Sequence, residues 1–210
     1  GELDRIIALP RRKPIEPGTP ESEACIERQM EKYAIHNNAC TCASIDENVA
    51  KGLRECIRRF LPIQARVLHE ISVSQGVLVN SPIGSGKTTL DIVGMLALRD
   101  CSHALLLIPA PLMDQIETDY RLIREHFRVP GLKIHGAGGT VREHAPRKNP
   151  HTGEPEPMLH VLPYSLFSTE KYSVWIETIQ PRAILSDECD AFADTQSTRT
   201  LRLMAYFGKY

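Results

Sequence analysis

The sequence predicts an α/β fold in which helices flank a parallel sheet. From residue 76 onward, short apolar runs alternate with longer segments of helical composition. Two of these runs, 104–108 and 183–185, contain no polar residue, which is typical of parallel strands that are covered on both faces. A glycine-rich loop at 81–89 joins an apolar run to a helical segment, and this strand–loop–helix order is that of a phosphate-binding loop.

The N-terminal part of the chain differs from the rest in composition. Residues 1–22 are rich in proline, arginine and glutamate and lack sustained periodicity, so we expect an extended arm. Residues 23–60 are expected to form a small helical segment that contains cysteines, with Ser22 as the N-cap of its first helix. The main domain is predicted to span 61–210.

Hydrophobic periodicity and chain breakers place the individual elements. We expect helices at 48–60, 61–74, 87–99, 111–127, 168–179 and 197–206, and strands at 76–80, 104–109, 132–135, 158–163 and 182–187. One face of the 111–127 helix is predicted to be buried through Leu112, Ile116, Tyr120, Ile123 and Phe127. Residues 136–157 contain four glycines and four prolines, so we expect a long flexible loop that is poorly ordered at its tip.

The run Ser81-Pro-Ile-Gly-Ser-Gly-Lys-Thr-Thr89 has the composition of a site for a triphosphate. Gly84 and Gly86 let the backbone curl so that successive amides point at phosphate oxygens. Lys87 is placed to reach the β- and γ-phosphates, and the Thr88 hydroxyl is placed to bind Mg²⁺. The alternative is a glycine-rich turn with a solvated lysine. The residues expected to bind ATP here are Pro82, Ile83, Gly84, Ser85, Gly86, Lys87, Thr88 and Thr89.

An acidic pair supplies the second half of such a site. The apolar strand that begins at Ala183 ends in Asp187-Glu188, and ligands of open parallel sheets collect at the carboxyl ends of strands. Asp187 is expected to hold Mg²⁺, and Glu188 is expected to orient and deprotonate the attacking water. With Lys87 they form the predicted catalytic set. The alternative is an acidic cluster that caps the next helix or faces solvent.

Together the two motifs resemble those of the first RecA-like domain, a P-loop NTPase domain, in superfamily 2 DEAD/DEAH-box helicases. Ser81-Pro82 in place of the usual first glycine is similar to these proteins, and Asp187-Glu-Cys-Asp190 is similar to their four-residue box. Cys189 departs from the alanine that is usual there. The resemblance implies that Gln64, in Leu61-Pro-Ile-Gln64, reads the adenine edge; the alternative is an exposed helix residue.

Three further segments extend the resemblance. Residues 105–115 and 160–165 are similar to segments that touch the nucleic-acid backbone, and the alternative for each is an ordinary strand–turn–helix connection. Residues 197–203 resemble the corresponding segment of chromatin-remodeller-like helicases, and those encoded by tailed phages are the most similar.

The resemblance implies an ATP-dependent DNA helicase or translocase that hydrolyses ATP with Mg²⁺ to move on nucleic acid. Such motors need an arginine from a second RecA-like domain. The motifs of that domain are absent from these residues, so we expect it to join in cis or in trans and the isolated chain to hydrolyse ATP weakly. Two alternatives stay open: a nucleotide-gated or structural interaction module without motor activity, and an RNA helicase.

The cysteines indicate a second, independent site. Four of the six lie close together, at Cys25, Cys40, Cys42 and Cys56. In a reducing compartment this clustering favours metal over disulfides, and four thiolates suit tetrahedral Zn²⁺. His36 is an alternative ligand to Cys25. The other interpretation is a set of small buried residues. Cys101 and Cys189 are expected to be buried thiols.

Overall composition limits the remaining classes. The formal net charge is −1, so nucleic-acid binding would need a local patch. No apolar stretch reaches the 18 or so residues of a membrane span, and the N-terminus does not resemble a secretion signal. We therefore expect a cytoplasmic protein without a membrane partner, in the host cytoplasm if it is phage-encoded.

Overall fold

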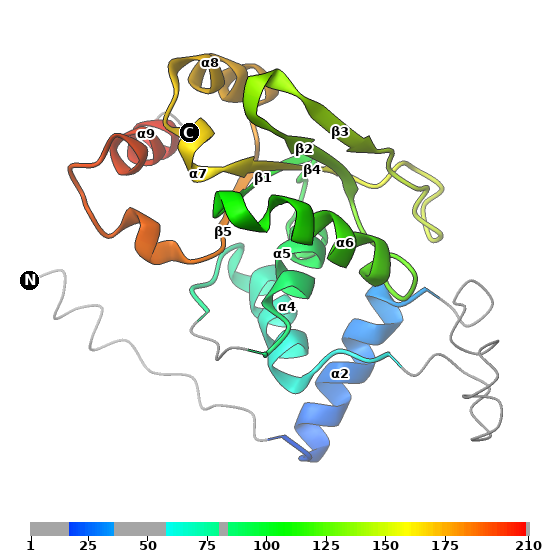
Figure 1. Cartoon of the computed structure of the whole chain (residues 1–210). Coiled ribbons are helices and arrows are strands. Elements are labelled where there is room, and N and C mark those ends of the chain that lie inside the picture. Colours follow the sequence, from blue (N-terminus) through cyan, green and yellow to red (C-terminus); the bar gives the residue numbers. More distant parts are fainter. Residues whose placement is uncertain (1–16, 36–57, 80–83, 209–210) are drawn as a thin grey trace, which may run out of the picture.

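The computed structural model describes residues 17–35, 58–79 and 84–208. In this part of the chain, five strands form one sheet with the order β3-β2-β4-β1-β5 (Figure 1). All neighbouring strands are parallel except β2 and β3. The strands are β1 (His103–Ile108), β2 (Gly131–His135), β3 (Val141–His144), β4 (Met158–Pro163) and β5 (Ala183–Ser186). The predicted α/β class with a mainly parallel sheet is therefore confirmed.

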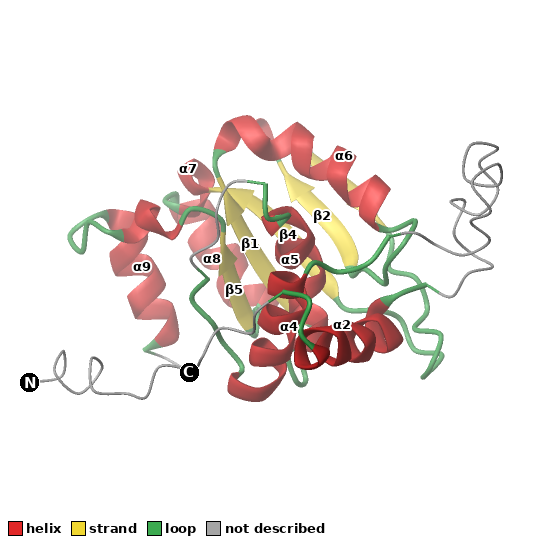
Figure 2. Ribbon diagram, turned by 90° about the horizontal axis from the view of Figure 1, so that it is seen from below, coloured by secondary structure: helices red, strands yellow, loops and turns green. Residues whose placement is uncertain are grey.

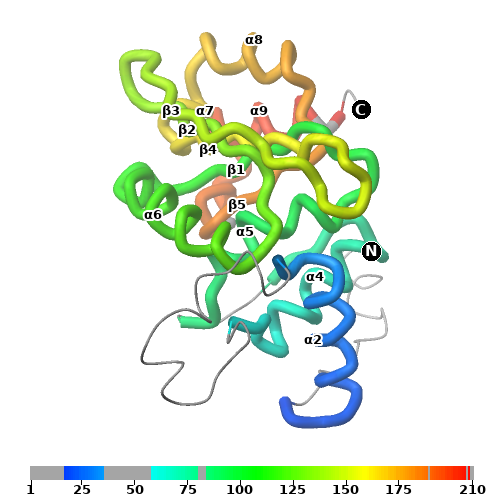
Figure 3. The backbone as a smooth tube through the Cα atoms, turned by 90° about the vertical axis from the view of Figure 1, so that its right-hand side faces the viewer, coloured from blue at the N-terminus to red at the C-terminus, as the bar shows by residue number. Residues whose placement is uncertain are grey.

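Helices cover both faces of the sheet and create two hydrophobic cores (Figures 2 and 3). The first core is closed by α2 (Pro20–Tyr33), α4 (Pro62–Ser74), α5 (Lys87–Val93) and α6 (Met113–Ile123). The second is closed by α7 (Tyr164–Phe167), α8 (Glu170–Ile179) and α9 (Thr198–Phe207). Short 3₁₀ helices are η2 (Gly94–Ala97), η3 (Ala110–Leu112), η4 (Ala137–Gly139) and η5 (Cys189–Phe192).

The apolar run of β1 explains why one strand can serve both cores. Leu106 and Ile108 point into the first core, whereas Leu105 and Leu107 belong to the second. Successive side chains of a strand point to opposite faces, so a strand covered on both sides needs apolar residues at every position. The burial of β1 on both faces is as predicted. The run in β5 is only half-buried, because β1 is its one strand neighbour among the described residues.

The strand predicted at 76–80 is wrong for the residues that the structure describes there. Residues 76–79 form no strand, and Leu78 is 82% exposed. An apolar run becomes a strand only where a neighbour supplies hydrogen-bond partners. A cleft separates this segment from β5, so no such partner is within reach.

The long loop predicted at 136–157 is also corrected. Residues 141–144 form β3, which pairs antiparallel with β2 and places Glu143 opposite Lys133. These two side chains form an ion pair of 3.3 Å. Gly138 and Gly139, both with φ in the left-handed region, make the reversal between the strands. The glycines that indicated a flexible loop thus form the turn of a hairpin.

Three predicted helix boundaries shift. The N-cap of α2 is Thr19 rather than Ser22: the Thr19 hydroxyl accepts a hydrogen bond of 3.2 Å from the Ser22 amide. The helix predicted at 87–99 changes into η2 after Val93. The helix predicted from 111 begins as η3, and Leu112, expected to be buried, is 37% exposed because it precedes the amphipathic part of α6.

Three histidines lie side by side on the face of the sheet that α8 covers. His103 Nδ1 is 3.1 Å from His160 Nε2, and His135 Nε2 is 3.3 Å from His160 Nδ1. The Trp175 ring of α8 packs on His135 and His160, with centroid distances of 4.4 and 5.2 Å. Burial lowers the pKa of His135 to about 4 and the pKa of His160 to about 3, and the positive charge of Lys133 acts in the same direction. Both rings are therefore neutral at physiological pH.

Gly131 provides a test of how tightly β2 and its neighbours pack. A Cβ at this position would lie 2.8 Å from Met158 Cε and 2.9 Å from the backbone nitrogen of Pro146. We expect Gly131→Ala to lower the free energy of unfolding by roughly 1–3 kcal/mol, the usual cost of overpacking. Gly76→Ala is the matched control, since nothing lies within 4 Å of its added Cβ. Urea unfolding curves of the two variants should differ; equal midpoints would contradict the packing seen around β2.

Candidate functional site

A cleft of about 670 Å³ opens between β5 and the segment 75–79. Lys87 and Asp91 of α5 line it together with β5 and the acidic residues that follow. Ligand pockets commonly measure about 300–1,000 Å³, so its volume suits a small molecule. The cleft runs along the whole length of β5, from Arg182 to Asp187 and Glu188. Its end at Asp187 and Glu188 lies at the carboxyl ends of the strands, where Ile108 pairs with Pro163 and Leu107 pairs with Ser186. The carboxyl ends of β1, β4 and β5 therefore meet at one edge of the sheet, where open parallel sheets bind ligands.

The glycine-rich loop leads into α5, and Lys87 is the residue of its described part that lines the cleft. Gly84 and Gly86 have φ values of 84° and 70°, a conformation that glycine adopts without strain. The helix α5 begins directly at Lys87, whose exposed side chain lines the cleft. The Ser85 hydroxyl oxygen is buried and has no hydrogen-bond partner within the described part of the chain. Ser85 is not among the residues that line the cleft, so its contact with a phosphate stays a prediction.

The structure does not bring the other described residues of the predicted loop to the cleft. Thr88 and Thr89 are half-buried, and the Thr89 amide donates to Gly86 O at 3.1 Å. Neither threonine is among the residues that line the cleft. Ser81, Pro82 and Ile83 lie outside the described residues. The roles predicted for these positions in ATP and Mg²⁺ binding stay predictions.

Gln64 is buried, and its side-chain amide hydrogen-bonds to the backbone of the glycine-rich loop. Its Oε1 accepts a hydrogen bond of 2.8 Å from the Leu61 amide, at the start of α4. Its Nε2 donates to Gly86 O at 3.0 Å and to Ser85 O at 3.4 Å. At 5% exposed, Gln64 is not the exposed helix residue of the alternative interpretation. Its amide joins α4 to the phosphate-loop candidate, and its predicted contact with adenine stays a prediction.

The acidic pair forms a strained turn at the end of β5. The Asp187 amide continues the sheet by donating to Leu107 O at 3.1 Å. Glu188 then has φ 60° and ψ 67°, a left-handed conformation that residues with a side chain rarely adopt and that is often found at functional sites. Asp187 is half-buried and Glu188 is exposed, and both line the cleft. The structure therefore brings Lys87, Asp187 and Glu188 to one cleft.

The chain matches no protein-family model, and no curated protein is significantly similar to it. Within the described residues, no helix is long and apolar enough to cross a membrane. Function must therefore be argued from the site itself.

Asp91 is a site residue that the sequence reasoning missed. It follows Lys87 by four positions, the spacing that places two side chains on one face of a helix, and both line the cleft. Burial and, to a smaller extent, the Asp187 carboxylate raise the pKa of Asp91 to about 7, against the opposing charge of Lys87. The i, i+4 spacing from the predicted phosphate-binding lysine was the signal that could have identified it.

The cysteine site is tested at one ligand only. Cys25 is 2% exposed and packs within the first core on α2. Cys40, Cys42 and Cys56 lie outside the described residues. Where the structure describes the chain, no group of three or more histidine, cysteine or acidic residues is arranged to hold a metal ion. Zinc binding by the four cysteines stays a prediction.

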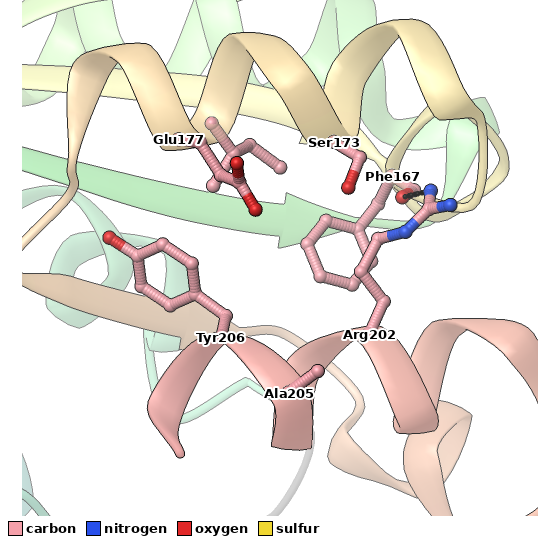
Figure 4. Close-up of a pocket in the computed structure, with 7 residues that line it drawn as sticks. Phe167, Ser173, Glu177, Arg202, Ala205 and Tyr206 are labelled. Atoms are coloured by element: carbon pink, nitrogen blue, oxygen red, sulfur yellow. Dashed lines mark hydrogen bonds between the residues drawn. The ribbon is translucent and has the colours of Figure 1, made fainter. Parts of the chain in front are cut away.

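A second, smaller cavity lies between α8 and α9 (Figure 4). Its volume is about 50 Å³, which is far too small for a nucleotide. Arg202 closes it by donating to Phe167 O at 2.8 Å and to Thr169 O at 2.6 Å. This cavity is a packing feature of the second core.

Proposed function

We propose that the chain is a RecA-like ATP-binding domain that binds Mg-ATP at the end of the cleft that reaches the carboxyl edge of the sheet. The observation that carries this proposal is the convergence of Lys87 with Asp187 and Glu188, which are far apart in sequence, on one cleft. A cationic lysine beside a curled glycine loop suits phosphates, and carboxylates opposite it suit a hydrated Mg²⁺. Few other ligand classes need both charges in this arrangement.

The side chains divide the chemistry between them. Lys87 would neutralise phosphate charge, and Ser85 and the glycine loop would hold phosphate oxygens. Asp187 and the Thr88 hydroxyl would hold Mg²⁺, which neutralises charge on the phosphates when it is bound. Glu188, exposed at the rim, is free to accept a proton from an attacking water. Joined to a second RecA-like domain, such a site would drive movement on DNA.

The segments that resemble nucleic-acid contacts support the motor interpretation. They contain the last residues of β1 and β4, which pair in register at Ile108 and Pro163, and the turns that follow. Both therefore leave the sheet at its carboxyl edge, the edge at which Asp187 and Glu188 follow β5. A nucleic acid bound there would lie close to the predicted ATP site, which is what coupling of the two requires. Comparing DNA with RNA as a stimulator of ATP hydrolysis would separate the two nucleic acids.

A second candidate function is a nucleotide-gated interaction module. The cleft wall at 76–79 and the edge of β5 present apolar residues, including Val77 at 43% exposed and Leu78 at 82%. Exposed apolar residues beside a sheet edge suit a protein partner. Turnover separates the candidates, since a module would bind ATP without hydrolysing it even when a second RecA-like domain is supplied.

Replacing Asp187 tests the proposed site directly. We expect Asp187→Asn to abolish most of the increase in ATP affinity that Mg²⁺ gives, about tenfold, while affinity without Mg²⁺ changes little, because the carboxylate contacts the metal rather than the nucleotide. Isothermal titration of ATP with and without Mg²⁺ measures both quantities. Glu170→Gln, an exposed acid at the start of α8, controls for the change in net charge. An unchanged Mg²⁺ effect in Asp187→Asn would remove Asp187 from the site.

A further inference from the structure

Tyr164 connects α7 to the acidic turn across the neighbouring strand. It is the first residue of α7, directly after β4, and is 7% exposed. Its hydroxyl lies 2.7 Å from Ser186 Oγ, donates to Asp187 O, and lies 3.4 Å from Glu188 O. Because β1 separates β4 from β5, the side chain reaches across a whole strand to make these contacts.

The single proton of the Tyr164 hydroxyl decides which of these contacts is a full hydrogen bond. A phenol has one proton to donate, so it cannot bond both carbonyls fully. The contact with Glu188 O is long, at 3.4 Å, so the proton is donated to Asp187 O, and the Ser186 hydroxyl can then donate to the phenol oxygen. An ordinary phenol is protonated at neutral pH, so Tyr164 is a donor.

The bond to Asp187 O controls the conformation of the whole turn. This oxygen belongs to the peptide group that links Asp187 to Glu188, and peptide groups are planar. Fixing the oxygen fixes the plane, and the orientation of the plane sets ψ of Asp187 and φ of Glu188. Glu188 has a left-handed φ of 60°, which persists only where the surroundings enforce it. Within the described structure, Tyr164 is placed to enforce it.

The ring of Tyr164 is itself held by residues that follow the turn. Phe192 of η5 packs edge-on against it, with ring centroids 5.6 Å apart. The Arg199 guanidinium of α9 lies 5.8 Å from its centroid, within the range of a cation–π contact. Ser165, the next residue of α7, is exposed. The segment thus presents one residue to solvent and the adjacent one to the acidic turn.

We propose that Tyr164 is a positioning residue that sets the directions of the Asp187 and Glu188 carboxylates and couples them to whatever binds at the exposed side of α7. The coupling rests on the proposed function, in which the ligand at α7 is a nucleic-acid backbone. The positioning of the turn rests on the hydrogen bonds alone. A displacement of α7 would move the phenol, release the peptide plane and turn the carboxylates away from the cleft.

Tyr164→Phe tests positioning because it removes one oxygen and keeps the ring. Tyr206→Phe is the matched control: it lies in the same core and loses a buried hydroxyl that donates to Pro181 O at 2.9 Å, away from the acidic turn. We expect amide hydrogen exchange of the isolated chain at 186–193 to rise about tenfold in Tyr164→Phe and to stay unchanged in Tyr206→Phe. Equal exchange at 186–193 in both variants would overturn the positioning role, whether or not the chain binds ATP.

Two further measurements test the link to the site. In Tyr164→Phe we expect the gain in ATP affinity that Mg²⁺ gives to fall about fivefold, while the affinity without Mg²⁺ stays the same. A general loss of stability would lower both affinities. A DNA oligonucleotide should reduce exchange at 186–193 in the wild type and in Tyr206→Phe, but not in Tyr164→Phe.

If the wild type binds Mg-ATP and DNA yet all three proteins respond alike, the coupling is wrong and the proposed function stands. If the wild type binds neither, the proposed function and the coupling both fail, and the exchange result still decides the positioning role.

Discussion

Lys87→Ala is expected to lower the affinity for Mg-ATP by about 100-fold or more. A lysine that contacts two phosphates makes charge-assisted hydrogen bonds worth about 1.5–3 kcal/mol each, and about 2.8 kcal/mol corresponds to 100-fold in affinity. The side chain is exposed in the structure and lines the cleft. Its removal should therefore leave the fold intact and affect the ligand alone.

The control and the measurement for Lys87 follow from this exposure. Lys171→Ala removes an exposed lysine from α8, which covers the other face of the sheet. Fluorescence titration with a labelled ATP analogue should show lost binding in Lys87→Ala and wild-type binding in Lys171→Ala. Thermal unfolding without nucleotide should be the same for both. ATP affinity within twofold of the wild type in Lys87→Ala would exclude the cleft as the ATP site.

The sequence identified the elements that carry strong local signals. The fully apolar run of β1 predicted a strand buried on both faces, and Leu105 and Leu106 do lie in different cores. The same rule failed at 76–79, where the apolar residues have no neighbouring strand to pair with and Leu78 is exposed. Composition reports the tendency to be buried, but a strand also needs a partner that only the tertiary fold provides.

For the candidate site, the chemically active residues could be predicted from the sequence, but the hydrogen bonds that hold them in place could not. Lys87 and Asp187 were expected on chemical grounds, and both line the cleft. The hydrogen bonds of Gln64 to Gly86 and of Tyr164 to the acidic turn join segments that are distant in sequence. No periodicity or motif encodes such long-range contacts. Asp91 is intermediate, because its helical spacing from Lys87 was visible but the burial that raises its pKa was not.

Two of the stacked histidines, His135 and His160, should make the protein sensitive to acid. His135 and His160 have an ordinary pKa of 6.5 when unfolded and values of about 4 and about 3 in the fold. A histidine whose folded pKa is lowered binds protons more readily when unfolded, so stability is lost as the pH falls below about 6.5 and levels off near the folded pKa. Each histidine should cost about 1.4 kcal/mol per pH unit in this window.

Asp91 opposes this loss and allows the two effects to be separated. Its pKa is raised from 3.8 to about 7, so protonation of Asp91 below pH 7 stabilises the fold by about 1.4 kcal/mol per pH unit. Between pH 6 and pH 5 the wild type should therefore lose roughly 1.4 kcal/mol, the difference between two histidines and one aspartate. In Asp91→Asn the opposing carboxyl is gone, and the loss should double to roughly 2.8 kcal/mol.

Urea unfolding at pH 7.5, 6 and 5 measures both slopes. His160→Gln in the Asp91→Asn background should reduce the steeper slope by about half or more, because it removes one titrating ring and the neighbour that His135 contacts at 3.3 Å. His151→Gln is the control, since His151 is exposed and its replacement should leave the slope unchanged. The same slope in Asp91→Asn with and without His160 would show that the stacked histidines do not cause the acid sensitivity. The histidine part of the prediction concerns packing beneath α8 and is measured without nucleotide, so it holds whether or not the cleft binds ATP.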